Sequence, residues 1–164
     1  SVEAQTDPAV VQVLRRVVCD RPNVLSTLPA ALADCRQLVS EAVQRDGMLL
    51  EWASPRLRDC RGVVLEAVRS KGMALQFASA ALRADRIVVL ASIAQCGLAL
   101  QYASTSMRAD REVVLEATRG HALSIQYAAA ALKADREVVL TAARHVEGFR
   151  HACARMKDER DVVL

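Results

Sequence analysis

Apolar residues recur along the chain with a period of 25 residues. The triplet Val-Val-Leu stands at residues 63–65, 88–90, 113–115 and 138–140, and it returns after 24 residues at 162–164. Leu38-Val39-Ser40 occupies the same position one period earlier. Self-similarity at a fixed period of this length is the sequence signature of a repeat architecture. The chain is therefore expected to be a stack of like-built units.

Each unit is predicted to contain two helices. The first, at about residues 61–70, is apolar on more than one side, which is typical of a helix packed between two neighbours. The second is expected at about residues 74–83, with Leu75, Ala78 and Leu82 on one face. Acidic residues are expected to cap the first helices: Asp59, Asp85, Asp110 and Asp135. Glycines in the left-handed conformation are expected to end them: Gly47, Gly72 and Gly97.

The period is regular from residue 35 onward and weak before it. Residues 1–34 are expected to form a divergent N-terminal capping repeat, or one side of a continuing array. Residues 35–164 are expected to form tandem repeats in a single continuous solenoid. The predicted fold is an all-α α-solenoid of about six 25-residue helix-turn-helix repeats. The helix at residue 164 is expected to be truncated or to continue, with an exposed apolar face that docks on another surface.

One motif within the repeat resembles the DUF4116 family. Leu-Arg-Ala-Asp-Arg-x-Val-Val-Leu-x-Ala is followed by a glycine and then by Leu-Gln-Tyr-Ala-Ser, with matching segments at residues 82–91 and 98–104, 107–117 and 125–129, and 132–140. The resemblance covers roughly residues 32–164. It implies tandem helical repeats of unknown function, found mainly in unicellular algae, other protists and some bacteria. It implies no established activity and no catalytic residues. The departures at Ala122 and His151 are expected to alter loop geometry.

The amino-acid composition limits which cellular compartments and which kinds of partner are expected. Of the 164 residues, 52% are apolar and 3% aromatic, and the net charge of +3 demands neither a nucleic acid nor an anionic membrane as partner. None of the five cysteines, at 19, 35, 60, 96 and 153, forms a CxxC pair, so free, buried thiols are expected. No signal peptide is visible. The expected location is an intracellular reducing compartment, either the cytoplasm or the interior of an organelle such as a chloroplast.

The membrane question arises at a single stretch. Residues 87–107 carry no charge over 21 residues, a length that can span a bilayer. The stretch also contains several polar residues, and the equivalent stretches one period away are charged. A soluble hairpin is therefore predicted, and no transmembrane span.

Basic residues form two predicted rows along the stack. The first row is Arg36, Arg61, Arg86, Arg111 and Arg136, and the second is Arg58, Arg83, Arg108 and Lys133. Helix packing predicts steps of about 9–10 Å within a row. Such rows can hold phosphates through guanidinium contacts. Pairing with nearby acids is the favoured interpretation, and the acids concerned are Asp85, Asp110, Asp135, Glu66 and Glu116.

Two further columns follow the same period. The aromatic column is Trp52, Phe77, Tyr102, Tyr127 and His151. Because each member is followed by alanine, the column is interpreted as structural core rather than a stacking platform for single-stranded nucleic acid. The glutamine column is Gln76, Gln101 and Gln126, with Glu51 in the same position. It could recognise a ligand repeat by repeat, but hydrogen bonds to neighbouring backbone are the favoured interpretation.

No catalytic constellation emerges from the sequence. His145, His151 and Cys153 lie close together but lack a paired ligand set, so no metal or cofactor is predicted. No Ser/His/Asp set or glycine-rich phosphate loop can be assembled either, so an enzyme is not expected. The leading hypothesis is a non-enzymatic protein–protein interaction scaffold, such as an accessory or linker subunit of a larger assembly. The alternative is a phosphate-backbone binder, for RNA or anionic lipid, that acts through the arginine rows.

Overall fold

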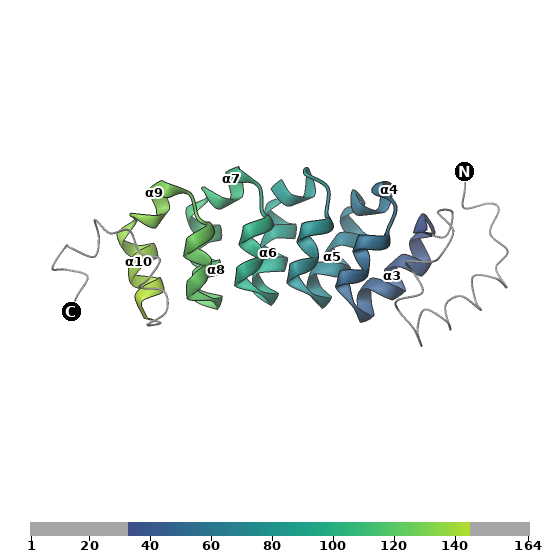
Figure 1. The fold of residues 1–164 in the computed structure, drawn as a ribbon, viewed down its shortest axis with the longest axis horizontal. Coiled ribbons are helices and arrows are strands. Elements are labelled where there is room, and N and C mark those ends of the chain that lie inside the picture. Colours follow the sequence, from purple (N-terminus) through teal and green to yellow (C-terminus); the bar gives the residue numbers. More distant parts are fainter. Residues whose placement is uncertain (1–32, 145–164) are drawn as a thin grey trace.

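The described residues of the computed structural model, 33–144, form an elongated array of helices that run side by side (Figure 1). The first helices of five successive repeats are α3 (Arg36–Arg45), α5 (Arg61–Ser70), α6 (Arg86–Gln95), α8 (Arg111–Gly120) and α10 (Arg136–Ala143). No strand occurs in this part of the chain. The capping repeat expected over residues 1–34 lies almost wholly outside the described residues, as do His151 and the last predicted helix.

The helices form two rows, and the core lies between them. Each first helix contacts the first helix before it and the one after it, and the 3-10 helices that follow them contact one another in the same order. The Val-Val pairs of the repeats point into the space between the rows, where Val63, Val64, Val88 and Val89 are wholly buried. Because burial runs from neighbour to neighbour along the stack, the predicted all-α solenoid is confirmed.

The second half of each repeat is not the single helix that was predicted. A six-residue 3-10 helix opens it: η3 (Gly47–Trp52), η4 (Gly72–Phe77), η6 (Gly97–Tyr102) or η7 (Ala122–Tyr127). A short helix follows after a break: α4 (Pro55–Arg58), η5 (Leu82–Ala84), α7 (Thr105–Arg108) or α9 (Ala130–Lys133). The helix expected at residues 74–83 is thus divided at Ala78 and Ser79.

A backbone hydrogen bond between repeats explains this break. The N–H of Ser79 donates to the carbonyl oxygen of Arg58 in the preceding repeat at 3.0 Å, and Ser104 does the same to Arg83 at 2.9 Å. An N–H that bonds across to another repeat cannot also bond within a continuous helix. The serine hydroxyl then caps the following turn, as Ser104 does by accepting from the N–H of Met107.

The predicted N-caps are confirmed at three of four positions. The carboxylates of Asp85, Asp110 and Asp135 each accept hydrogen bonds from two N–H groups in the first turn of the following helix. Asp59 does not cap α5, because it lies one residue too early and Cys60 occupies the N-cap position. The Asp59 carboxylate instead accepts a hydrogen bond from the hydroxyl of Ser79 in the next repeat.

The glycines mark the ends of the first helices for a different reason from the one predicted. No glycine in the described residues has a positive φ, so the expected left-handed conformation is wrong. Gly47, Gly72 and Gly97 each begin a 3-10 helix, where a Cβ atom would lie less than 3.0 Å from a backbone carbonyl oxygen of the next first helix. Glycine is therefore required by the close approach of neighbouring repeats.

Candidate functional site

Three members of the first arginine row, Arg61, Arg86 and Arg111, are paired with acids of the following repeat, whereas Arg36 and Arg136 form no ion pair among the described residues. Arg61 contacts Asp85 at 2.8 Å, and Arg111 contacts Asp135 at 3.1 Å. Arg86 pairs with both Asp110 and Glu112, and Arg111 also pairs with Glu137. The favoured interpretation is thus confirmed for the three N-cap aspartates. These arginines link successive repeats, and their guanidinium groups are already engaged.

Two details of this pairing differ from the prediction. Glu66 and Glu116 are not partners of the row, since Glu116 pairs with Arg119 in its own helix at 3.2 Å. Glu112 and Glu137 are further partners of this row, which sequence reasoning missed. Their spacing of 26 residues from Arg86 and Arg111 was the available signal.

Hydrogen bonds favour the ionised form of two of these aspartates, Asp85 and Asp135. Burial raises the pKa of Asp85, but hydrogen bonds from Arg61 and from the backbone N–H groups of Val88 and Ile87 outweigh it, so the pKa is lowered overall. The pKa of Asp135 is lowered in the same way through Arg111. Hydrogen bonds to Asp135 and Glu137 in turn raise the pKa of Arg111. These ion pairs therefore link each of these repeats to the one that follows it.

The row is incomplete at its first member. Arg36 is exposed and has no acidic partner among the described residues, because Cys60 and Gly62 occupy the positions that Asp110 and Glu112 hold opposite Arg86. The guanidinium nevertheless lies over this site, since a Cβ atom on Gly62 would be 3.3 Å from the Nη2 atom of Arg36.

We expect Cys60→Asp to raise the free energy of unfolding by about 1 kcal/mol, because the added carboxylate would cap α5 and reach Arg36. Cys60→Asn is the matched control, since it supplies a cap without a charge and should give a smaller gain. Urea unfolding at low and high salt measures both, and salt should narrow the difference between them. Equal stabilities at low salt would contradict the proposed pairing.

The second row of cations is not paired with acids. The side chains of Arg58, Arg83 and Arg108 are half-buried, and their Nε atoms are buried without a hydrogen-bond partner. Lys133 in the fourth position is also half-buried and forms no ion pair among the described residues. The favoured interpretation, pairing with acids, is therefore wrong for this row.

The aromatic column lies at the surface edge of the core. Phe77, Tyr102 and Tyr127 are half-buried and pack against the core, whereas Trp52 is 43% exposed. The prediction that these rings belong to the core is therefore correct only for the side of each ring that packs against it. One edge of each ring remains accessible to a partner.

The expected hydrogen-bond ladder of the glutamines is not formed. Among the described residues, the side chains of Gln76 and Gln126 make no hydrogen bond, and that of Gln101 makes a single weak one, from its Nε2 to the sulfur of Met73 at 4.0 Å. All three side chains are half-buried. Their amide groups are thus held in place by packing and left with unused donors and acceptors.

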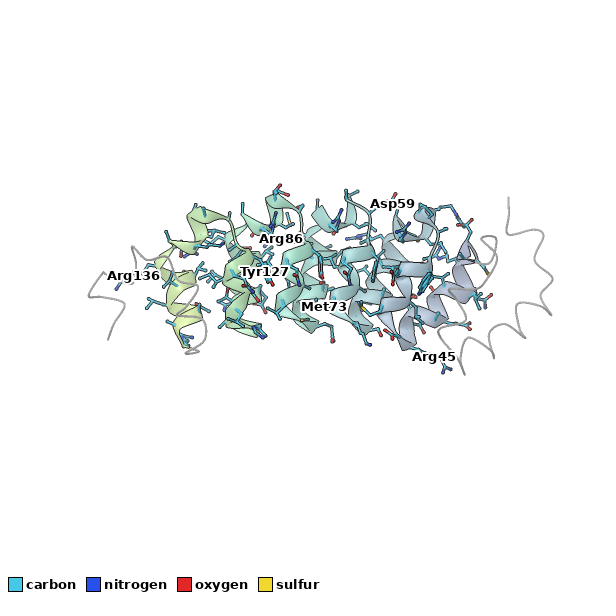
Figure 2. The ribbon with its side chains drawn as sticks, viewed as in Figure 1. Arg45, Asp59, Met73, Arg86, Tyr127 and Arg136 are labelled. Carbon is cyan, nitrogen blue, oxygen red and sulfur yellow. The ribbon has the colours of Figure 1, made fainter. Side chains whose placement is uncertain are left out.

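These three sets of residues belong to one side of the array. Each glutamine directly precedes its ring on a 3-10 helix, and η4, η6 and η7 contain no charged residue. Arg108 and Tyr127 line one small hollow, although they come from adjacent repeats. We call this surface the glutamine–aromatic face, and its members are Gln76, Phe77, Gln101, Tyr102, Gln126 and Tyr127, bordered by Arg58, Arg83 and Arg108. Met73 and Tyr127 are labelled in Figure 2.

The family model DUF4116, a domain of unknown function, matches the chain twice, at residues 35–83 and 85–133. The chain belongs to this family. Each matched DUF4116 segment spans two of the repeats described above, so one family domain corresponds to a pair of repeats. No curated protein and no solved structure matches the chain. The DUF4116 assignment confirms the resemblance and the tandem repeats, and it carries no activity.

Residues 33–144 contain neither a membrane-spanning helix nor a cluster of metal-ligating side chains. No helix in this range is long and apolar enough to cross a membrane. No group of three or more His, Cys, Asp or Glu side chains in the same range could hold a metal ion. Cys35, Cys60 and Cys96 are free thiols and only half-buried, not the fully buried residues expected. His145, His151, Cys19 and Cys153 lie outside the described residues.

Proposed function

We propose that the protein is a non-enzymatic scaffold that binds another protein on its glutamine–aromatic face. The observation that carries this proposal is a set of half-buried side chains that make no hydrogen bond to the described residues: Gln76, Gln126, Arg83 and Arg108. Their solvent-facing polar atoms are free to bond to water or to a ligand. An incoming ligand would therefore bind them without displacing an internal bond.

The spacing of the glutamines suits an extended segment of a partner protein. Successive repeats step by about 9–10 Å, and an extended chain advances about 3.3 Å per residue, so one repeat would meet every third residue. A glutamine amide can donate to a backbone carbonyl and accept from a backbone N–H. The exposed ring edges of Phe77, Tyr102 and Tyr127 offer apolar contact beside those bonds.

The charge of the face selects an acidic segment. Arg58, Arg83 and Arg108 border η4, η6 and η7, and these three 3-10 helices carry no acid. A guanidinium group presents paired donors that match a carboxylate. The proposed partner is therefore a protein with an extended acidic segment, and the chain would act as an accessory or linker subunit in the assembly that contains it.

Binding of RNA or anionic lipid is the weaker candidate. In the first arginine row, Arg61, Arg86 and Arg111 are engaged by acids, so the face has one open row of cations rather than two. The net charge of the chain is only +3. Phosphate-backbone binding draws on many cations and weakens steeply with salt.

Peptide selection tests this proposal. We expect random peptides of about twelve residues, displayed on phage and selected on the purified protein, to be acidic at roughly every third position. Arg83→Gln and Arg108→Gln together should weaken binding of a selected peptide at least about tenfold in fluorescence anisotropy. The matched control is Arg69→Gln with Arg119→Gln, which removes the same charge from the first helices.

Three results would count against the proposal. They are selected peptides without acidic residues, an equal loss in the control variant, and tighter binding of single-stranded RNA or of anionic vesicles than of any peptide.

A further inference from the structure

The outer side of α6 is unlike that of every other first helix. Its exposed stripe is Ile87, Leu90, Ala91 and Ala94, which recur at helical spacing and carry no charge. Ile87 is 57% exposed, and it is the most exposed large apolar residue in the described range. The equivalent stripe of α5 is Gly62, Leu65, Glu66 and Arg69, and that of α8 is Glu112, Leu115, Glu116 and Arg119.

This apolar stripe lies in the middle of the array and away from the glutamine–aromatic face. α6 is the third of the five first helices, between α5 and α8 (Figure 1). Its residues Val88, Val89, Ser92 and Ile93 are buried toward the 3-10 helices, so the stripe points outward. A groove runs from Leu90 and Ala94 to Leu115 of α8, and the charged side chains of α8 that line it are Glu112, Glu116 and Arg119.

We propose that a second copy of this chain covers the stripe, with the two α6 helices packed antiparallel about a two-fold axis. An axis that passes between residues 90 and 91 sets Ile87 opposite Ala94 of the second copy, and Leu90 opposite Ala91 of the second copy. Every large side chain then meets a small one, which is the complementarity that close packing needs. A parallel arrangement would set Ile87 on Ile87 and Leu90 on Leu90.

The flanking helices fit the same axis. Because the two copies are antiparallel, the two-fold places α5 over α5 and α8 over α8 of the second copy. Arg119 then lies opposite Glu112 of the second copy, and Arg69 lies opposite Gly62, one turn from Glu66. The Oε2 atom of Glu66 is buried and has no hydrogen-bond partner among the described residues. Because a two-fold interface is isologous, each of these contacts occurs twice.

Charged substitutions beside the two-fold axis test whether the partner is a second copy of this chain or a different molecule. The wild-type chain should have a mass near twice 17.8 kDa in sedimentation equilibrium, over concentrations from about 1 to 100 μM. Ala91→Glu and Ala91→Lys should each be monomeric, because they set like charges beside the axis. An equimolar mixture of the two should form a heterodimer. Glutamate stands at the equivalent positions 66 and 116, so the fold accommodates it.

Thr141→Glu is the matched control, because it introduces the same side chain at the equivalent position of α10, outside the proposed interface. It should leave the dimer intact. A wild-type chain that stays monomeric at every concentration would overturn the proposal, as would an Ala91→Glu variant as dimeric as the wild type. A mixture of the Ala91 variants that associates no better than either alone would do the same. None of these variants touches the glutamine–aromatic face, so peptide binding there succeeds or fails independently.

Discussion

Gly72→Ala is expected to lower the free energy of unfolding by about 3 kcal/mol, which is a large loss for a single methyl group. The added Cβ atom would lie less than 3.0 Å from the carbonyl oxygen of Ser92, in the first helix of the next repeat. That carbonyl is fixed, because it accepts the N–H of Cys96 at 2.9 Å at the end of α6. Neither repeat can give way without opening the contact between them. Urea unfolding measures the loss.

Gly120→Ala is the matched control for this substitution. Gly120 is the last residue of α8, and a Cβ atom there would meet nothing within 4 Å. Alanine should therefore stabilise the protein by about 0.5–1 kcal/mol, through lower chain entropy in the unfolded state. Equal effects of the two substitutions would contradict the view that close approach, rather than helix propensity, selects glycine at position 72.

The repeat departs from its pattern at the fourth glycine position, which holds Ala122. The sequence led to the expectation that this departure would alter the loop geometry. The structure shows no such change, because η7 begins at Ala122 and has the same six-residue length and the same extended N-cap conformation as η4 and η6.

Local signals made the first helices predictable and left the second halves of the repeats unpredictable. The bounds of α5 follow from the apolar pattern of residues 61–70, which is contained in the helix itself. The break at Ser79 depends on a hydrogen bond to Arg58 in another repeat. No propensity within residues 74–83 reveals that bond, so the pattern there suggested a continuous helix.

The candidate site shows the same division. The pairing of Arg61 with Asp85 was predictable, because both residues recur with the repeat and their charges are opposite. Whether the second cation row and the glutamines have partners was not predictable, because this depends on which polar groups the folded chain places near them. Arg83 and Gln76 recur as regularly as Arg61, yet their side chains have no hydrogen-bond partner in the part of the chain that the structure describes. Recurrence in the sequence indicates a shared environment, and only the fold shows what that environment contains.

Leu100→Ala is expected to lower the free energy of unfolding by about 2–5 kcal/mol, because it opens a cavity where little can relax. Leu100 is wholly buried on η6, which packs against η4 on one side and η7 on the other. The cavity would therefore weaken two interfaces at the centre of the array. In a stack whose stability is the sum of its units and their interfaces, a central defect should also reduce cooperativity. Calorimetry measures both effects, with the second seen as a broader transition.

Leu100→Ile is the control that separates lost volume from changed shape. Isoleucine already occupies the equivalent position in the next repeat, where Ile125 is wholly buried. The swap conserves volume and should cost less than about 1.5 kcal/mol, with an unbroadened transition. If isoleucine proved as costly as alanine, the repeats would not be interchangeable at this position, and the picture of like-built units would have to be given up there. If alanine were tolerated, Leu100 would not hold the central interfaces together.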